Sequence, residues 1–215
     1  IMTQEEYLAS LEKSKEEAHD ETMWGKPARD IITGIGNNSG IRPVRAIWEL
    51  VQNARDVVGE GQRAHIVFTR KIDSLEFKHN GIPFTHKTIE ALIMQTSSKV
   101  SSNNVQVGQY GTGFLTTHYY GMKFSLFGSY QIGDGMYIDL DGFQIDRAHE
   151  SIDELINKIT YQLHQTDELL NRSYSAERKE WTTFAYDLPA HHMEGAAKGI
   201  EAAIKQMPYV MLFND

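Results

Sequence analysis

The chain of 215 residues carries 21 basic and 29 acidic side chains, a formal net charge of −8, and no cysteine. This composition excludes disulfides, thiolate nucleophiles and cysteine-ligated zinc, and the acidic balance does not indicate nucleic-acid binding. Because no apolar run reaches membrane-spanning length, we expect a soluble, cytoplasmic protein whose residues 1–215 form a single domain.

The first 60 residues predict two helices separated by a loop. Residues 3–19 are rich in Glu, Lys and Ala, with apolar side chains at helical spacing, which predicts an amphipathic helix. The glycine-rich segment 34–40 predicts a loop. A second helix is expected to begin at Pro43, since proline is tolerated in a first turn, and to end near Gly59 and Gly61.

The middle of the chain changes to a period of two. Alternating apolar and polar side chains over 64–81 predict a β-hairpin. Residues 88–94 predict a short helix, and the small, polar segment 96–104 can order on a ligand but cannot build a core. A further helix is expected at 115–120, directly after a glycine-rich stretch.

The second half of the chain alternates between strands and helices. Residues 139–142, Asp-Leu-Asp-Gly, lack the rest of a calcium loop and are interpreted as a hairpin turn. The expected elements are strands at 123–127, 136–140, 143–145 and 182–186, helices at 150–172 and 193–206, and a last strand from Tyr209. This pattern predicts an α+β fold, a two-layer sandwich of a mixed, mostly antiparallel sheet covered by helices on one face. Because that last strand looks incomplete, we expect the N-terminal part of a longer protein, and Ile1 before Met2 suggests a cloning remnant.

The helix from Pro43 has one face that differs from an ordinary solvated surface. At 100° per residue, Glu49, Asn53 and Asp56 fall within a narrow arc. These side chains offer hard oxygen ligands and a potential base, which are the groups that hold Mg²⁺ and orient a water molecule. An exposed polar stripe without function is the alternative. The apolar residues expected to pack on the opposite side are Val44, Ile47, Val51, Ala54 and Val58.

The glycines at 108, 111 and 113 precede a predicted helix whose first amides have no helical partner. Backbone N–H groups at such a position, with no Cβ in the way, form a natural phosphate cradle. The segment is not a Walker loop, because no Gly-Lys-Ser/Thr follows, and it does not lie in a βαβ dinucleotide unit. Taken alone, it is equally compatible with a simple turn.

The order of these motifs resembles that of the GHKL, or Bergerat-fold, ATPases. Residues 49–56 (Glu-Leu-Val-Gln-Asn-Ala-Arg-Asp) are similar to the first motif of that superfamily, and 107–114 (Val-Gly-Gln-Tyr-Gly-Thr-Gly-Phe) to its glycine motif. Between them lie His-Asn-Gly at 79–81 and a lid-like Thr-Ser-Ser-Lys at 96–99. Thr-Thr-Phe at 182–184 stands for a later strand motif. The similarity covers roughly residues 30–190.

The resemblance implies a Bergerat ATP-binding fold, the cofactors ATP and Mg²⁺, and an ATP lid at 95–110. Glu49 would be the catalytic base that aligns and deprotonates a water molecule, and Asn53 would ligate the metal. Asp56 would support the same face or reach toward the base. The other residues that the resemblance assigns to ATP are His79, Asn80, Gly81, Ser98, Lys99, Gly108, Gln109, Tyr110, Gly111, Thr112, Gly113, Phe114 and Thr183.

The second motif departs from the superfamily pattern. Its aspartate, which accepts a hydrogen bond from the adenine amino group, is replaced by His79, and Pro83 takes the place of a glycine. A neutral His79 could accept from an amino group through its unprotonated nitrogen. A water molecule or Asn80 could also read the base, and a packed core histidine is the alternative.

We therefore expect Mg-dependent ATP binding and slow hydrolysis that act as a conformational switch. The resemblance is closest to chaperone-like ATPases of the heat-shock-ninety and sacsin types, which implies an unidentified protein client and a homodimer in the full-length protein. Neither a membrane nor a nucleic acid is expected as a partner. The alternatives are a degenerate nucleotide-binding scaffold without ATPase activity, a histidine kinase, and a DNA-repair or topoisomerase ATPase domain.

Overall fold

The computed structural model describes residues 4–37, 43–59, 61–95, 112–188 and 190–214. Most of the predicted lid lies outside these ranges, together with six predicted ATP-binding residues: Ser98, Lys99, Gly108, Gln109, Tyr110 and Gly111. In chain order the elements are α1 (Gln4–Asn37), α2 (Pro43–Asp56), β1 (Ile66–Arg70), β2 (Ser74–His79), β3 (Phe84–Thr85), α3 (His86–Met94), η1 (Thr112–Tyr119), β4 (Lys123–Gly133), β5 (Met136–Asp146), α4 (Ile152–Leu169), β6 (Thr182–Asp187), η2 (Ala190–His192) and α5 (Met193–Asn214). The elements η1 and η2 are 3₁₀ helices, and the other helices are α-helical.

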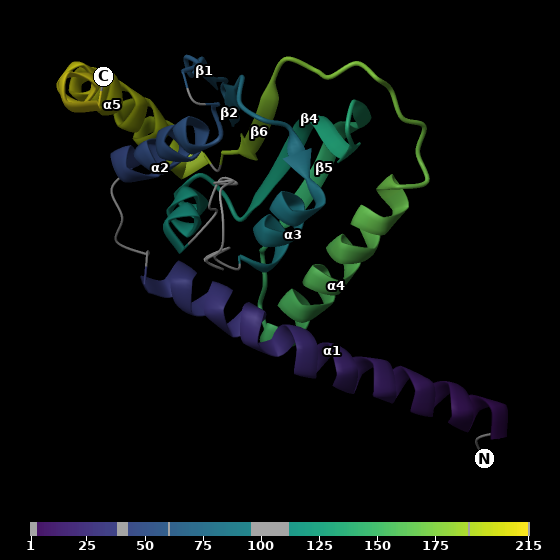
Figure 1. Cartoon of the computed structure of the whole chain (residues 1–215). Helices are drawn as coiled ribbons and strands as arrows, with labels where there is room; N and C mark the ends of the chain where they lie inside the picture. The colour runs from purple at the N-terminus through teal and green to yellow at the C-terminus, as the bar shows by residue number, and fades with distance from the viewer. Residues whose placement is uncertain (1–3, 38–42, 60, 96–111, 189, 215) are drawn as a thin grey trace.

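The six strands form one open sheet in which most neighbours are antiparallel (Figure 1). The strands β1, β2, β6 and β4 lie side by side in that order, and β5 runs along the other edge of β4. The short β3 pairs with β4 in parallel, beyond the part of β4 that β6 occupies. The hairpins β1–β2 and β4–β5 are thus separate in the sequence, and β6, which follows both, lies between β2 and β4 in the sheet.

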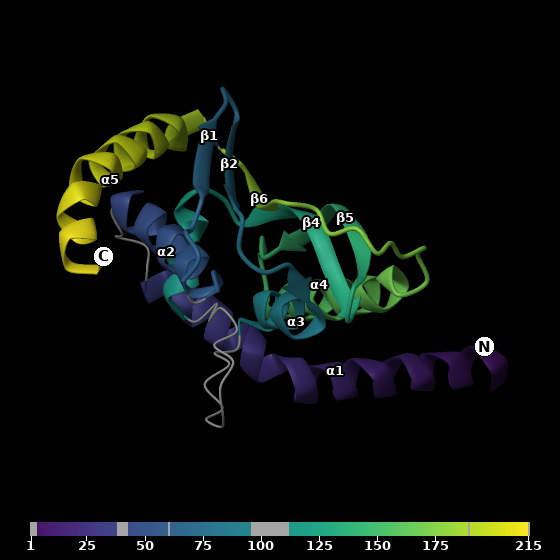
Figure 2. The ribbon, with the colours of Figure 1, turned by 45° about the horizontal axis from the view of Figure 1, so that its top comes forward.

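Helices cover one face of this sheet. The register pairs Phe77 with Phe184 and Leu126 with Phe184, so these three buried side chains share a face. On the opposite face, Val67 and Phe127 are exposed. Figure 2 shows α1, α3 and α4 on the same side of the sheet. The predicted α+β fold, with a mostly antiparallel sheet packed against helices, is confirmed.

The first helix is longer than predicted, because α1 continues through Gly34 and Gly36 to Asn37. Ala28 and Ile31 are completely buried, where α1 packs against α4 and η1. This burial stabilises the second half of α1 and outweighs the low helix propensity of the two glycines. Much of the expected loop at 34–40 is therefore helical.

The predicted turn at 139–142 is wrong, because β5 is continuous from Met136 to Asp146. Leu126 pairs with Phe143 but Phe127 pairs with Asp141, so one residue is extra at this point. That residue is Gly142, whose φ of +87° suits a glycine and marks a β-bulge. The Asp and Gly residues that suggested a turn instead bend a long strand.

The predicted final strand from Tyr209 is also wrong, because α5 continues as a helix to Asn214. The helix is anchored on α2, where a Cβ at Gly199 would lie 3.0 Å from Pro43. Once such packing has nucleated a helix, each added residue gains a hydrogen bond, so the helix extends into a sequence that locally favours a strand. No helix within the described ranges has the length and apolar character of a membrane span.

Candidate functional site

The helix α2 lies between η1 on one side and α5 on the other (Figure 2). The Trp48 indole donates a hydrogen bond of 2.9 Å to the Gln206 side chain in α5, and the Tyr120 hydroxyl donates one of 2.8 Å to the Pro43 carbonyl. Since neighbours pack on two sides, only a narrow strip of α2 can receive a ligand. The residues buried along α2 are Ala46, Ile47, Leu50, Asn53 and Ala54.

Asn53 lies at the edge of this buried arc and is only 8% exposed. Its side-chain nitrogen Nδ2 is buried and makes no hydrogen bond to any residue that the structure describes. A buried amide without a partner costs free energy and is uncommon in native proteins. An unpartnered amide nitrogen at the edge of a packed helix is therefore a donor that an acceptor atom of a ligand would satisfy.

Glu49 precedes Asn53 by one helical turn and is half-buried. Burial raises the pKa of the Glu49 carboxyl above its ordinary value of 4.5, and Arg45 opposes the shift. Asp56, on the same side of α2, is more exposed, and burial likewise raises the pKa of its carboxyl against the effect of Arg55. The three residues predicted from helical spacing do share one strip of α2, with Asn53 the most deeply buried.

The end of β2 packs directly against α2, one turn beyond Asn53. The Ile82 N–H donates a hydrogen bond of 2.9 Å to the Val57 carbonyl. A Cβ at Gly81 would lie 2.6 Å from Val57 Cγ2, so only glycine allows the turn after β2 to approach this closely. Because Asn53 and Val57 are four residues apart, the predicted residues at 79–81 lie beside the polar strip of α2.

His79 is 2% exposed, and its ring centroid lies 5.7 Å from that of Phe77 and 6.3 Å from that of Phe184. Its Nδ1 accepts a hydrogen bond of 3.1 Å from the Gly81 N–H. Burial lowers the pKa of the imidazole to about 4, and the positive charge of Arg178 lowers it further. The ring is therefore neutral, Nδ1 is unprotonated and occupied, and Nε2 carries the proton. The free nitrogen is a donor, whereas the sequence suggested an acceptor.

The Asn80 side chain makes hydrogen bonds to the backbone of the segment before β1. Its Oδ1 accepts a hydrogen bond of 2.8 Å from the His65 N–H, and its Nδ2 donates one of 3.1 Å to the Arg63 carbonyl. These bonds hold the segment that enters β1 against the end of β2. The geometry thus gives Asn80 a structural role and does not direct its amide toward a ligand.

The two threonines at the start of β6 lie on opposite faces of the sheet. Thr182 pairs with His79, so it shares the face that the helices cover, whereas Thr183 pairs with Lys78 on the other face. Thr182 is buried and its hydroxyl donates to the Ile82 carbonyl at 3.3 Å. Strand alternation could have identified Thr182, rather than the predicted Thr183, as the neighbour of His79.

The end of the predicted glycine motif forms the start of η1. Thr112 and Gly113 are its first two residues, and Phe114 is fully buried with its ring 6.0 Å from that of Phe184 and 5.8 Å from that of Phe124. Phe114 therefore anchors η1 on the sheet, next to the residues that surround His79. Its ring belongs to the core.

One residue near this site was missed in the sequence analysis. Arg178, in the segment between α4 and β6, donates a hydrogen bond to the Gly81 carbonyl through Nη2. Its neighbours in the sequence are exposed and polar, so no local pattern distinguishes it. Only the return of β6 between β2 and β4 brings Arg178 over the end of β2.

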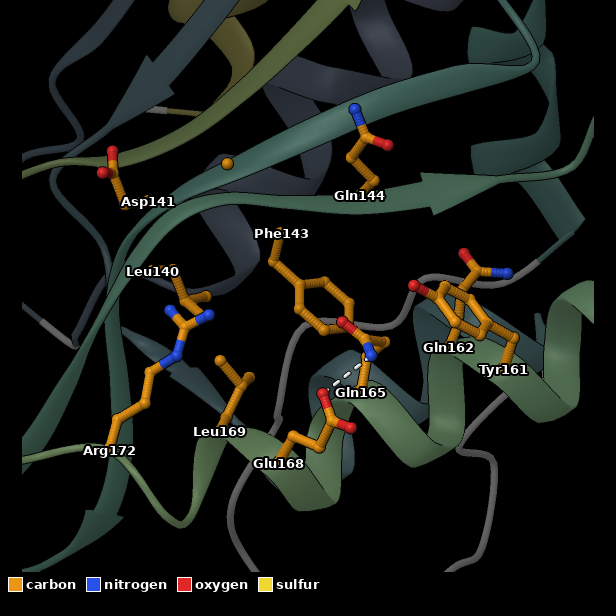
Figure 3. A pocket seen from close by; sticks show the side chains of 11 residues that line it. Leu140, Asp141, Phe143, Gln144, Tyr161, Gln162, Gln165, Glu168, Leu169 and Arg172 are labelled. Atoms are coloured by element: carbon orange, nitrogen blue, oxygen red, sulfur yellow. Dashed lines mark hydrogen bonds between the residues drawn. The ribbon is translucent and has the colours of Figure 1, made fainter.

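The cavity between β5 and α4 and the cavity between α1 and α4 both lie away from the polar strip of α2. A cavity of about 260 Å³ lies between β5 and α4, where Leu140, Phe143 and Leu169 meet amide and charged side chains at the rim (Figure 3). A second cavity of about 450 Å³ separates α1 from α4 and is lined by the acids Glu17, Asp20, Glu21 and Asp153. None of the predicted site residues lines either cavity.

No protein-family model matches the chain, and no curated protein is similar to it. Among the residues placed in the structure, no three His, Asp or Glu side chains converge in a way that could hold a metal ion. A Mg²⁺ ion at Asn53 would therefore need oxygen atoms from a bound substrate, which is how Mg²⁺ is usually held beside phosphates. The functional assignment depends on the residues around Asn53.

Proposed function

We propose that this domain binds a Mg-nucleoside triphosphate, ATP in the first instance, against the polar strip of α2 and hydrolyses it slowly. The observation that supports this most directly is the buried, unpartnered side-chain nitrogen of Asn53, a donor that a phosphate oxygen could satisfy, one turn from a half-buried carboxyl with a raised pKa. A purely structural helix face would pair or expose such groups. The order of motifs that resembles GHKL ATPases agrees with this geometry.

In this proposal the Asn53 side chain would hold Mg²⁺ through its oxygen, and the ion would neutralise phosphate charge. Glu49 would accept a proton from the water molecule that attacks the terminal phosphate. A carboxylate whose pKa is raised by burial holds a proton more strongly than an exposed one, which suits a general base. Gly81 keeps the end of β2 against Val57, so that His79 lies on the element packed beside the far end of this strip.

The slow turnover would make the bound state a signal to other parts of the protein. The strip that would hold the nucleotide is on α2, and α2 contacts α5 through Trp48 and Gln206. A ligand that moves α2 by a small amount would therefore shift α5. In a chaperone-like protein this motion would reach a second subunit or a protein client, the partners that the resemblance implies.

A second candidate is a nucleotide-binding scaffold without ATPase activity. It is favoured by His79, whose unprotonated nitrogen already accepts from Gly81 and is not available to an adenine amino group. In this alternative the fold and the α2 strip persist, but recognition of ATP has been lost. The two candidates differ in whether Mg-ATP stabilises the native state, which a true ligand must do.

Calorimetry with Mg-ATP, followed by measurement of phosphate release, tests the proposal. We expect Asn53→Ala to weaken Mg-ATP binding at least tenfold and Glu49→Gln to abolish phosphate release while preserving binding. Gln52→Ala, at an exposed position of the same helix, is the matched control and should behave as wild type. If Asn53→Ala binds Mg-ATP as tightly as wild type, the metal assignment is wrong. If the wild type binds no nucleotide, the proposed function is wrong.

A further inference from the structure

The polar strip of α2 and the neighbouring end of β2 differ in chemistry, which would orient a bound nucleotide. Glu49 and Asn53 form a polar end, whereas His79 lies among the rings of Phe77 and Phe184. A nucleoside triphosphate has a charged end and a flat, largely apolar base. The charged phosphates would lie at the polar residue Asn53, and the flat base would lie at His79 beside the aromatic rings. This step rests on the proposed nucleotide site.

The hydrogen bond from the Gly81 N–H fixes the tautomer of His79. A backbone N–H can only donate, so Nδ1 must be the unprotonated nitrogen, and in a neutral imidazole the proton then lies on Nε2. Within the described residues, Nε2 makes no hydrogen bond that would use this proton. The nitrogen that remains for a ligand is therefore a donor.

The other charged or polar groups next to His79 do not reverse this polarity. Arg178 is a cation that can only donate, and it already holds the Gly81 carbonyl. The Thr182 hydroxyl donates to the Ile82 carbonyl. No carboxylate contributes to the electrostatic environment of His79, where Arg178 is the charged neighbour. This end of the site offers donors to a base.

Purine bases differ at position 6 in whether they donate or accept a hydrogen bond, and a donor such as His79 Nε2–H distinguishes the two. Adenine carries an amino group there, which is a donor, whereas guanine and hypoxanthine carry a carbonyl oxygen, which is an acceptor. An amino group that faces the Nε2–H of His79 would leave two donors opposed and unpaired, which weakens binding. A 6-oxo group would pair with Nε2–H.

We propose that His79 selects 6-oxopurine nucleotides, such as GTP or ITP, over ATP. His79 is then a specificity-determining residue, and the natural substrate of the site is a 6-oxopurine nucleoside triphosphate. Asn53 and Glu49 keep the roles toward metal and water given above, and only the preferred base differs.

Two measurements test this inference. The first is ¹⁵N NMR of the labelled imidazole in the protein without nucleotide, which distinguishes a protonated ring nitrogen from an unprotonated one. We expect the proton of His79 on Nε2, and a proton on Nδ1 would overturn the inference. The second is calorimetry with Mg-ATP, Mg-GTP and Mg-ITP. ITP is the sharpest probe, because it differs from ATP only at position 6 and the adjacent ring nitrogen.

We expect ITP to bind about tenfold more tightly than ATP, and His79→Phe, which keeps an aromatic ring but removes the donor, to bring the two affinities together. His164→Phe, at an exposed histidine of α4, should keep the wild-type preference. Equal or tighter binding of ATP by the wild type overturns the inference and leaves the proposed function intact. Failure of all three nucleotides to bind overturns both. If His79→Phe does not fold, the wild-type affinities and the NMR result still decide.

Discussion

Gly81 and Val57 are in such close contact that no side chain fits between them. A Cβ at Gly81 would lie 2.6 Å from Val57 Cγ2 and 2.9 Å from the Val57 carbonyl oxygen. This contact joins the end of β2 to α2, and it sets the distance between His79 at the end of the sheet and Asn53 on the helix. The relative position of the two halves of the candidate site therefore depends on a glycine.

Gly81→Ala should destabilise the domain by about 1–3 kcal/mol, because part of the contact is with backbone that cannot rotate away. Urea denaturation measures this change. Gly36→Ala is the control, since nothing lies within 4 Å of a Cβ at that helical position, and it should leave stability unchanged or slightly raise it. Equal stabilities of Gly81→Ala and wild type would show that α2 and β2 are not in this contact.

The pH dependence of phosphate release should reveal the environment of Glu49. The base must be ionised to accept a proton, and burial raises the pKa of its carboxyl, so the rate should rise with pH through a midpoint above the ordinary value of 4.5. Arg45 lowers that pKa by its charge, so Arg45→Gln should move the midpoint to higher pH. A midpoint that moves to lower pH would exclude Glu49 as the titrating base.

The sequence predicted the elements whose patterns are local. The hairpin β1–β2 and the helix from Pro43 follow from periodicity, and α2 does bring Glu49, Asn53 and Asp56 to one strip. The sequence pattern could not predict the features that depend on tertiary packing. The burial of Ala28 and Ile31 extends α1, and the packing of Gly199 on Pro43 anchors the helix that replaced the predicted last strand.

The details of the site were hidden for the same reason. Residue types alone could not reveal that the Gly81 N–H occupies His79 Nδ1, or that Asn80 is committed to the segment before β1. The position of Arg178 depends on β6 joining two distant hairpins. Thr182 is the exception, because strand alternation already distinguishes it from Thr183.

Two buried histidines should make the domain less stable in mild acid. Burial lowers the pKa of His79 to about 4 and that of His118 to about 3, and Arg147 adds to the shift at His118. Below pH 6.5 the unfolded chain takes up protons that the folded protein resists. The free energy of unfolding should therefore fall, by up to about 1.4 kcal/mol per pH unit for each histidine.

Urea denaturation at pH 7, 6 and 5 measures this slope. His118 donates through Nδ1 to the Gly121 carbonyl and accepts from Arg147 through Nε2, and His118→Gln supplies one donor and one acceptor there without titrating. This variant should lose about half of the acid sensitivity, whereas His164→Gln, at an exposed position, should keep it. Glu49 and Asp56, whose pKa values are raised, act in the opposite direction at lower pH. A slope in His118→Gln as steep as in wild type would contradict the prediction.

Trp48 should report nucleotide binding. It lies on α2 next to Glu49, and its side chain connects this helix to α5. Its indole N–H donates to Gln206 at 2.9 Å, and Gly199 packs closely on Pro43 in the same contact, where an added Cβ would lie 3.0 Å from Pro43. If nucleotide moves α2 relative to α5, the surroundings of this indole change, and Mg-nucleotide should alter the tryptophan fluorescence. The change should disappear in Trp48→Phe and persist in Trp24→Phe, which alters a tryptophan of α1. A nucleotide that binds by calorimetry but leaves the Trp48 emission unchanged would show that the signal does not pass through the α2–α5 contact.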